Sequence, residues 1–327
     1  MRIRSVRKYT LLLMLFGFTK SFAQQTLQYS QYMFNGLAVN PAYAGYKEDW
    51  TLNLASRLQW AGVDGAPKTN SLSIDGVTND DTKNVGLGFL VNNDRLGPEN
   101  NSSVYINYAY RLRLNEEDSQ RLCFGIAAGA IQYSIDGSLF NPASTTDPSI
   151  PTGIQNKFLP DFRAGIYYYT PLMYIGVSAL NLLPQVGSDP NSIFIMPVRT
   201  YYATGGLILP LTPEISLKPS VMFKEDLKGP TNMDVASYLV FNKVLWVGAA
   251  YSSGVLLLNK TDLPVVLNRT AALTASVAVN VTPRCRIGYS YDFVTTELPG
   301  YQSGSHELSF SLSFGRSRER VLSPRFF

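Results

Sequence analysis

Alternating segments too long for ordinary soluble strands are the strongest constraint on how this chain can fold. Between Val104 and Leu114, apolar and aromatic side chains occupy every second position. A period of two indicates a β-strand whose two faces meet different surroundings. Strands in soluble proteins usually have about 5–6 residues, whereas a tilted transmembrane strand needs about 9–11. The segment therefore predicts a strand that crosses a membrane, with one face toward lipid and the other toward water.

Segments of the same kind recur along the rest of the chain: Leu122–Ile131, Ile215–Lys224, Met233–Phe241, Ala271–Asn280, Cys285–Phe293 and Glu307–Phe314. In the last of them, large apolar residues alternate with a glutamate and serines. Together with shorter alternating segments, the pattern predicts about 14 strands between residues 50 and 314. The number is even, as expected for a bacterial single-chain barrel with both ends in the periplasm.

The connections between these segments alternate between short and long. The short ones include Asn115–Ser119 and Thr170–Leu172, and the long ones include Asn92–Asn101, Ser134–Lys157 and Leu182–Arg199. Outer-membrane barrels have short periplasmic turns and long extracellular loops. This asymmetry is independent of the strand pattern and predicts the same all-β fold, an antiparallel transmembrane β-barrel.

A soluble β-sandwich or β-solenoid would also contain many short strands. The 20 tyrosines and 17 phenylalanines of the sequence gather toward strand ends, as in Tyr167–Tyr169 and Tyr201–Tyr202. That placement is typical of the aromatic girdles at membrane interfaces. No segment after residue 23 approaches the roughly 18 consecutive apolar residues of a transmembrane helix. A membrane-embedded chain of this kind has to form a closed barrel.

The first 23 residues have the organisation of a secretory signal peptide. Basic residues precede an apolar run from Thr10 to Phe18, and Ser21 and Ala23 are small residues at the expected cleavage point. Five of the 28 basic residues lie in this segment, so its removal would leave 23 basic against 24 acidic residues. A nearly neutral mature chain gives no electrostatic reason to expect nucleic acid as a partner. The expected location is the outer membrane, with the lipid bilayer around the barrel.

Residues 24–49 precede the expected barrel and are rich in turn-forming and aromatic residues. Pro41 has a fixed φ and biases Asn40 toward an extended conformation. The aromatic side chains need a surface that covers them; they are Tyr29, Tyr32, Phe34 and Tyr43. We expect this segment to be ordered and to pack in or under the periplasmic mouth of the barrel. A disordered leader is the alternative.

Residues 315–327 follow the barrel as a short basic tail that we expect in the periplasm. Arg316, Arg318 and Arg320 repeat at every second position. These arginines could meet acidic periplasmic partners, or they could belong to a solvated tail without a partner.

Charged residues fall on the water-facing side of the expected strands. With the lipid-facing residues as reference, ten charges point into the lumen: Arg57, Asp75, Arg111, Arg113, Asp161, Arg163, Lys218, Arg286, Asp292 and Glu307. Either they line a solvated porin lumen, or they form a paired network that narrows or plugs the interior. Side chains fill a barrel of about 8 strands, and one of about 16–18 strands holds an aqueous channel. A barrel of about 14 strands is compatible with both.

Signals of catalysis, of metal binding and of cofactor binding are absent from the sequence. The single histidine, His306, lies between Ser305 and Glu307, and adjacent strand residues point to opposite faces, so these three cannot form a catalytic triad. Histidine and cysteine clusters with metal-ligand spacing do not occur. Strand glycines such as Gly86 and Gly125 indicate curvature or close approach of another backbone. An outer-membrane hydrolase built on paired carboxylates is the remaining enzymatic alternative.

Three early stretches combine aromatic, glycine and proline residues in distinctive motifs: Gln28–Asn35, Asn40–Gly45 and Arg57–Thr69. They resemble the PorP/SprF family of outer-membrane proteins, which accompany type IX secretion and gliding motility. The third is similar to the family's R-x-Q-W-x-G-x-x-G-A-P-x-T run. The resemblance implies a non-enzymatic barrel that helps to secrete and anchor a cell-surface adhesin through the adhesin's C-terminal sorting domain. It also implies periplasmic or lipoprotein components of the secretion and gliding machinery as partners.

The early motifs and the basic tail supply the residues expected to bind these partners: Tyr29, Tyr32, Phe34, Asn40, Pro41, Tyr43, Trp60, Asp64, Pro67, Arg316, Arg318 and Arg320. The loop from Trp60 to Thr69 is equally compatible with a turn that only closes a hairpin. The alternative function is a passive porin or small-molecule transporter of the same fold.

Overall fold

The computed structural model describes residues 29–79, 81–140, 151, 153–183, 194, 197–227, 229–255, 271–294 and 303–314. The helical elements are η1 (Tyr32–Phe34), α2 (Gly36–Val39), η2 (Pro41–Tyr43) and η3 (Gly137–Leu139). The strands are β1 (Thr51–Leu58), β2 (Lys68–Val77), β3 (Val85–Leu96), β4 (Glu99–Arg113), β5 (Arg121–Asp136), β6 (Ile154–Tyr169), β7 (Met173–Leu180), β8 (Thr200–Leu207), β9 (Leu209–Pro210), β10 (Ile215–Glu225), β11 (Thr231–Phe241), β12 (Leu245–Val255), β13 (Ala271–Thr282), β14 (Cys285–Val294) and β15 (Ser305–Ser313). No helix among these residues has the length and apolarity that crossing a membrane requires.

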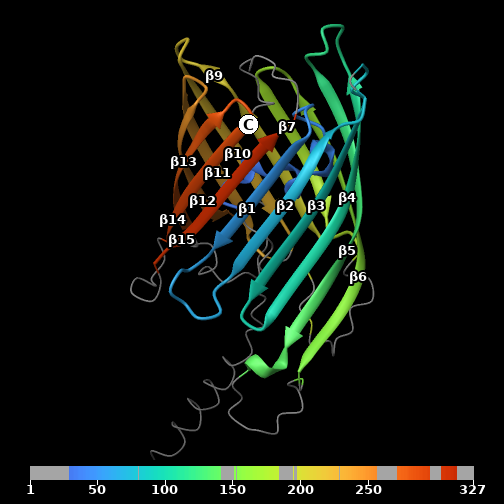
Figure 1. The fold of residues 1–327 in the computed structure, drawn as a ribbon, viewed down its shortest axis with the longest axis vertical. Coiled ribbons are helices and arrows are strands. Elements are labelled where there is room, and N and C mark those ends of the chain that lie inside the picture. The colour runs from blue at the N-terminus through green and yellow to red at the C-terminus, as the bar shows by residue number, and fades with distance from the viewer. Residues whose placement is uncertain are drawn as a thin grey trace, which may run out of the picture.

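The strands form one closed antiparallel sheet (Figure 1). Consecutive strands pair with one another, and the sheet closes where β1 pairs with β15, from Thr51 opposite Ser313 to Leu58 opposite His306. The short β9 continues the wall position of β8, because both pair with β10. The prediction of a 14-strand transmembrane β-barrel is therefore confirmed.

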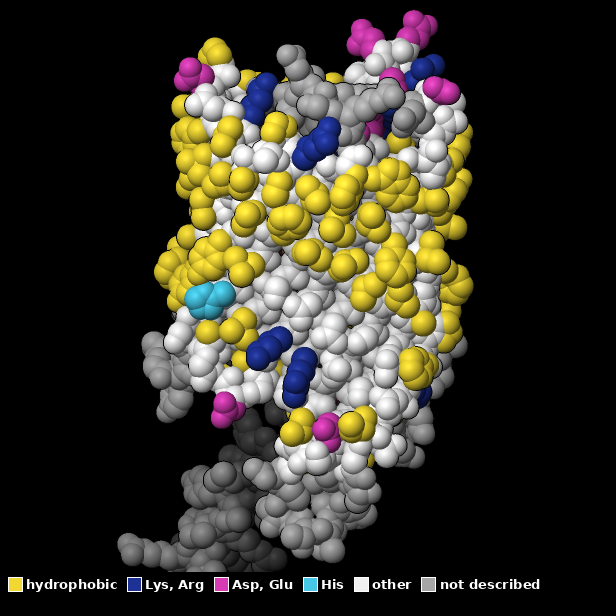
Figure 2. Space-filling model, in the orientation of Figure 1, with side chains coloured by type: hydrophobic (Ala, Val, Ile, Leu, Met, Phe, Trp, Pro, Cys, Tyr) yellow, Lys and Arg dark blue, Asp and Glu magenta, His cyan; other side chains and the backbone are white. Residues whose placement is uncertain are grey.

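Polar, charged and aromatic side chains face the interior of the barrel, and mostly apolar side chains face outward. Along β4, Tyr105, Asn107 and Arg111 are buried, whereas Ile106 is 66% exposed. The exposed apolar side chains form a band across the face drawn in Figure 2. Along β4 and the residue that follows it, the outward apolar positions run from Val104 to Leu114, which spans about 25 Å along the membrane normal at the usual strand rise and tilt. That height fits the apolar band of outer-membrane barrels.

The two ends of the barrel differ in how they connect the strands. Short turns, such as residues 78–84 and 114–120, lie at the end drawn uppermost in Figure 1. At the opposite end β5 and β6, with 16 residues each, extend beyond the rest of the wall. Because short turns mark the periplasmic side of such barrels, the lower end in Figure 1 faces the cell exterior.

Strand boundaries on the extracellular side differ from those predicted from the sequence. A loop was expected over Asn92–Asn101, but β3 and β4 continue and leave only Gly97 and Pro98 as the turn. The loop expected over Ser134–Lys157 is shortened by β5 and β6 in the same way. On β3, β4 and β5 the outward residues of these extensions are polar, so the apolar alternation ends before the strand does.

The N-terminal segment, residues 29–49, lies inside the barrel. Its short helices η1, α2 and η2 appear in dark blue behind β1–β3 in Figure 1. Toward the extracellular end, the Tyr29 hydroxyl donates to Asn92 Oδ1 at 3.1 Å. At the periplasmic end, the amide of Val77 donates to the carbonyl oxygen of Glu48 at 3.2 Å. The segment therefore runs inside the lumen and reaches the periplasmic mouth of the barrel at Glu48.

Candidate functional site

The N-terminal segment is shaped by short-range contacts of its own. Asn40 Oδ1 accepts a hydrogen bond of 2.9 Å from the amide of Ala42 and so caps η2, which begins with Pro41. Asparagine followed by proline is a favoured start for a helical turn. Gly36 allows η2 to fold back, because a Cβ there would lie 2.5 Å from the ring of Tyr43. The result is a compact body rather than an extended leader.

Aromatic side chains of the wall cover this body. The rings of Tyr46 and Tyr169 meet edge-to-face with centroids 4.8 Å apart. Beside the short turn that joins β11 to β12, the ring of Phe34 lies 5.6 Å from Trp246 and 5.7 Å from Tyr238. Edge-to-face pairs of this kind add stabilisation beyond the burial of apolar area. These contacts supply the surface that the aromatic residues of the segment require.

Two strand glycines lie where the segment backbone touches the wall. A Cβ at Gly86 of β3 would be 2.0 Å from the carbonyl oxygen of Ala44, and one at Gly125 of β5 would be 2.1 Å from the amide nitrogen of Ala42. Any larger residue would collide with backbone atoms, which cannot rotate away. These two glycines therefore permit the close approach of the segment.

Strands β6 and β7 hold the middle of the segment by hydrogen bonds. Asn40 Nδ2 donates to the carbonyl oxygens of Ile166 and Val177 at 3.1 and 3.2 Å. The Ser178 hydroxyl donates to the carbonyl oxygen of Val39 at 2.6 Å. Buried polar groups need partners of this kind, so one asparagine both caps η2 and ties it to two wall strands.

A segment-binding cluster, formed by Arg57, Asp292 and Glu307, holds the start of the segment. Glu307 accepts hydrogen bonds from the amides of Ser30 and Gln31 at 2.7 and 3.0 Å. Asp292 accepts one from the Ser30 hydroxyl at 2.9 Å. Arg57 lies 2.6 Å from Asp292 and 3.4 Å from Glu307, and all three side chains are buried. Two buried carboxylates share one guanidinium, and the segment supplies further donors that they need.

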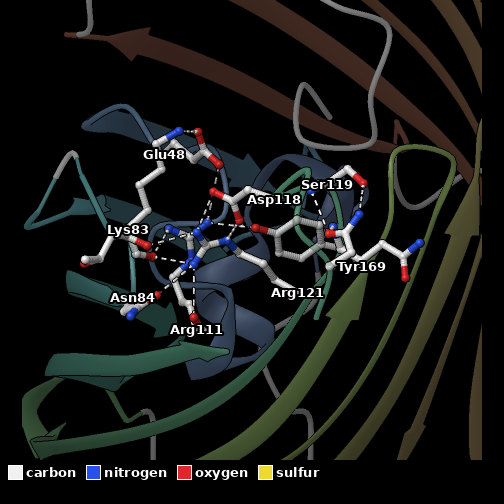
Figure 3. A network of polar contacts seen from close by, with 11 residues as sticks. Glu48, Lys83, Asn84, Arg111, Asp118, Ser119, Arg121 and Tyr169 are labelled. Atoms are coloured by element: carbon white, nitrogen blue, oxygen red, sulfur yellow. Dashed lines mark hydrogen bonds and ion pairs between the residues drawn. The ribbon is translucent and has the colours of Figure 1, made fainter. Parts of the chain in front are cut away.

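A turn-binding cluster lies at the periplasmic end and is formed by Glu48, Lys83, Arg111, Asp118 and Arg121 (Figure 3). Arg121 makes a two-pronged ion pair with Asp118, with N–O distances of 2.6 and 2.7 Å. It also donates to the carbonyl oxygens of Lys83 and Arg111, at 2.9 and 3.0 Å. Bidentate guanidinium contacts are strong and directional, so Arg121 fixes two neighbouring periplasmic turns against each other.

The remaining members of the turn-binding cluster connect it to β6 and to the segment. Arg111 donates to the Tyr169 hydroxyl at 2.8 Å and to the carbonyl oxygen of Lys83 at 3.0 Å. The Lys83 ammonium lies 2.6 Å from a carboxylate oxygen of Glu48. Glu48 is therefore the place where the end of the segment joins this cluster.

Other inward-facing charges contact aromatic rings or the segment backbone. Three cations lie over rings, with centroid distances of 3.4 to 3.9 Å: Arg163 over Tyr105, Arg286 over Phe34 and Lys218 over Trp246. Such cation–π contacts are strongest when the cation is desolvated. Asp161 accepts from the Tyr105 hydroxyl at 2.8 Å, and Asp75 accepts from the amide of Gly45 at 3.0 Å.

The ten charges predicted to face the lumen are all buried except Arg113. Arg113 is exposed, because it lies at the periplasmic end of β4, beyond the enclosed positions. Sequence reasoning missed Arg121, although it stands at the first position of β5, where the inward alternation would have identified it. It also missed Glu48, which precedes the first strand and therefore has no alternation to reveal it.

The residues predicted to bind partners are divided between the lumen and the extracellular rim. Those of the early motifs, from Tyr29 to Tyr43, pack within the barrel. In the first loop the amide of Trp60 donates to the Ser305 hydroxyl at 3.2 Å, Asp64 is exposed and Pro67 is buried. The tail residues fall outside the described part of the chain: Arg316, Arg318 and Arg320.

A small cavity lies beside the segment and is bordered by Gln31, Phe34, Arg286 and Glu307. Its volume of about 10 Å³ has room for about one water molecule. Within the described residues, no three histidine, cysteine, aspartate or glutamate side chains are grouped to hold a metal ion. The chemistry that this lumen offers is the binding of a peptide segment through carboxylates, cations and aromatic rings.

Comparison with known proteins identifies both a family and a fold. The sequence matches the family described as Type IX secretion system membrane protein PorP/SprF over residues 21–312. No curated protein matches the chain. Among solved structures, the CymD monoaromatic hydrocarbon channel is similar with a TM-score of 0.52 and 12% sequence identity, over 86% of this chain and 93% of the channel.

Two further solved structures are similar at lower TM-scores. The Acinetobacter baumannii outer membrane protein Omp33 has a TM-score of 0.44 and 10% identity, over 82% of this chain and 98% of that protein. A Pseudomonas aeruginosa FadL homologue has a TM-score of 0.44 and 13% identity, over 86% and 92%. At this identity, the likeness to the CymD channel concerns the barrel fold alone. The family match covers nearly the whole chain, which therefore belongs to the PorP/SprF family of type IX secretion membrane proteins and is an outer-membrane β-barrel.

Proposed function

We propose that this barrel helps to secrete and anchor a cell-surface adhesin, held through the adhesin's C-terminal sorting domain. It works with periplasmic or lipoprotein components of the type IX secretion and gliding machinery. It acts by docking, not by catalysis and not by conducting solutes. The observation that carries the proposal is that residues 29–49 lie inside the lumen and that those from Tyr32 to Tyr46 are almost all buried. A barrel filled in this way offers its two ends to partners rather than a path through its centre.

The extracellular end offers a braced surface for the adhesin. The amide of Ala61 donates to the carbonyl oxygen of Gly304, and the amide of Ser303 donates to that of Ala61, both at 2.8 Å. Beside this brace Val63 is 40% exposed and Asp64 is exposed. A loop that is already fixed loses little conformational entropy on binding. The first loop therefore suits the docking of a partner.

The periplasmic end suits the machinery components. Trp50 is 38% exposed there, next to the point where β1 and β15 close the sheet. The basic tail with Arg316, Arg318 and Arg320 follows directly after β15 in the sequence. Positive charge of this density suits acidic partners.

A planar-bilayer recording tests the filled lumen. The intact chain is expected to give no steady channel, and a variant without residues 29–46 is expected to conduct. A large steady conductance of the intact chain would instead support a passive porin or small-molecule transporter of the same fold.

Co-purification from native membranes tests the docking itself, with bound proteins identified by mass spectrometry. The intact barrel is expected to carry a secreted adhesin. Asp64→Lys in the first loop is expected to reduce the amount of bound adhesin, whereas Glu116→Lys in an exposed periplasmic turn keeps it. Equal retention by both variants would contradict docking at the first loop, and the absence of any secreted protein would contradict the proposed function.

A further inference from the structure

The outer wall over β15, β1, β2 and β3 is ordered in three rows by the strand register. The row deepest in the membrane is apolar: Phe310, Leu54, Leu72 and Val91. The next row toward the extracellular side is more polar: Leu308, Ser56, Asn70 and Asn93. The third row ends in two cations: His306, Leu58, Lys68 and Arg95. Polarity therefore rises stepwise from the membrane interior toward the outside.

Lys68 and Arg95 are direct partners across β2 and β3, and both are exposed. Like charges directly opposite each other on one face of an antiparallel pair are destabilising. Their next neighbours in this row are Leu58 on one side and Asn100 on the other. The nearby carboxylate of Asp94 is on the opposite face, because successive strand residues alternate. Two adjacent positive charges thus stand on the outer wall without an acidic neighbour in the same row.

A groove of about 500 Å³ begins one row deeper in the membrane than this pair of cations, at Asn70 and Asn93. Its apolar lining comes from the outer face of the barrel: Leu54, Leu72, Val91, Ile287, Leu308 and Phe310. Ser56, Asn70 and Asn93 line the same groove. The Ser56 hydroxyl donates to Asn70 Oδ1 at 2.8 Å, and Asn93 Nδ2 donates to Asn100 Oδ1 at 2.7 Å. A lipid-exposed wall therefore carries a hollow with hydrogen-bonding groups at its polar end.

The position of the groove relative to the membrane indicates which molecule can occupy it. Figure 2 shows the apolar band above a paler zone, with two basic side chains close together on the long-loop side. This is the extracellular edge of the hydrocarbon layer, where the headgroups of outer-leaflet lipids lie. A second copy of the chain related by two-fold symmetry would repeat the same surface patch and bring further positive charge to it. A negatively charged lipid complements the site.

We propose that this groove binds a phosphate-bearing glycolipid of the outer leaflet. An acyl chain lies in the apolar hollow, the sugar meets the amides of Asn70 and Asn93, and a phosphate bridges Lys68 and Arg95. The guanidinium and ammonium groups are both established phosphate binders. The bound phosphate offsets the repulsion between the two cations. The site holds the first strands of the barrel, and hence the first loop, in contact with the outer leaflet.

Native mass spectrometry of the full barrel in detergent, titrated with purified lipopolysaccharide, tests this site. Lys68→Gln with Arg95→Gln is expected to weaken binding at least about tenfold, given the contribution of each basic residue to binding an anionic lipid. The matched control is Arg113→Gln with Arg284→Gln, which removes two exposed cations from the periplasmic end and is expected to leave binding unchanged. Equal binding by the two double variants would overturn the proposal.

Two further measurements separate the glycolipid from other occupants. Ser56→Phe fills the groove without changing charge and is expected to weaken lipopolysaccharide binding, whereas unchanged binding would remove the groove from the site. Inorganic phosphate at millimolar concentration is expected to leave the lipid bound, because the acyl chain and the sugar also contribute to its binding. Displacement of the lipid by phosphate would show that the site recognises the phosphate group alone, and this would overturn the glycolipid proposal. Dimerisation that disappears in the Lys68 and Arg95 double variant would identify the surface as an interface between copies and overturn the proposal.

Discussion

The two buried charge clusters of the barrel hold different parts of the molecule together. In the segment-binding cluster, Asp292 and Glu307 accept hydrogen bonds from Ser30 and Gln31, so the cluster joins the N-terminal segment to the wall. In the turn-binding cluster, Arg111 and Arg121 donate mainly to carbonyl oxygens of the wall itself.

The difference lies in the sign of the charge that each cluster has in excess. The segment-binding cluster has two carboxylates for one arginine, and amides of the segment supply the missing donors. The turn-binding cluster has more cations than acids, and carbonyl oxygens of the turns supply the missing acceptors. Loss of the segment therefore leaves the first cluster short of donors but leaves most of the second cluster satisfied. The segment-binding cluster therefore acts as a latch, which holds the segment in the lumen. The turn-binding cluster acts as a brace, which holds the periplasmic turns of the wall together.

Arg57→Ala is expected to have the largest effect. It leaves Asp292 and Glu307 buried without their shared cation, and removal of one partner from a buried ion pair costs about 3–5 kcal/mol. The measurement is the free energy of unfolding by guanidinium titration in detergent micelles, together with chymotrypsin cleavage at Tyr32 and Phe34.

The control for this prediction removes the acids as well. Arg57→Ala combined with Asp292→Asn and Glu307→Gln carries no unpaired charge and is expected to recover part of the lost stability. A single Arg57→Ala variant as stable and as protease-resistant as the natural chain would contradict the latch.

Arg121→Gln is expected to cost slightly less, about 2–4 kcal/mol, because it removes the charged pair with Asp118 and the bonds to turn carbonyls. Unlike Arg57→Ala, it is expected to leave the segment resistant to chymotrypsin. Arg113→Gln, an exposed arginine at the same end, is the control and is expected to change stability by no more than about 0.5 kcal/mol. Segment cleavage in Arg121→Gln would contradict the division between latch and brace.

The barrel could be predicted from the sequence because its cause is a local pattern. Strands such as β4 and β15 carry an apolar residue at every second position. This alternation can be recognised in the sequence even when the partner strands are not known. The predicted strand boundaries were wrong where strand formation depends on pairing with neighbouring strands and not on a local sequence pattern. β3 continues through Asn92 and Asn93 because β2 and β4 pair with it there, and polar residues on both faces gave no sign of a strand.

The site could be predicted only in part, for a similar reason. Inward alternation identified Arg57, Asp292 and Glu307, although these residues are far apart in the sequence. It could not show that their partners are Ser30 and Gln31, because the segment has no periodic pattern that fixes its depth in the lumen. That depth depends on the fit between its backbone and the wall glycines, which only the three-dimensional structure reveals.

Gly125→Val tests this fit and is expected to cost about 1–3 kcal/mol, as overpacking does. Its side chain would collide with the backbone at Ala42, so the segment is expected to shift and become open to chymotrypsin. Gly205→Val is the matched control, because the nearest atom to a Cβ at Gly205 is the carbonyl oxygen of Tyr174, at an ordinary 3.6 Å. Equal protease sensitivity of the two variants would show that the close approach does not position the segment.

Asn40→Ala is expected to have the smallest effect, about 1–2 kcal/mol, from the loss of the cap and of the bonds to Ile166 and Val177. Asn40→Asp separates these two roles. It keeps an oxygen that caps η2, but it turns a second oxygen toward two carbonyl oxygens where Nδ2 had donated. Because a buried acceptor facing acceptors is unfavourable, the aspartate variant is expected to be less stable than the alanine variant. If it instead matches the natural chain in guanidinium titration, capping is the whole role of Asn40, and only Ser178 ties this turn to the wall by a side-chain hydrogen bond among the described contacts of β6 and β7.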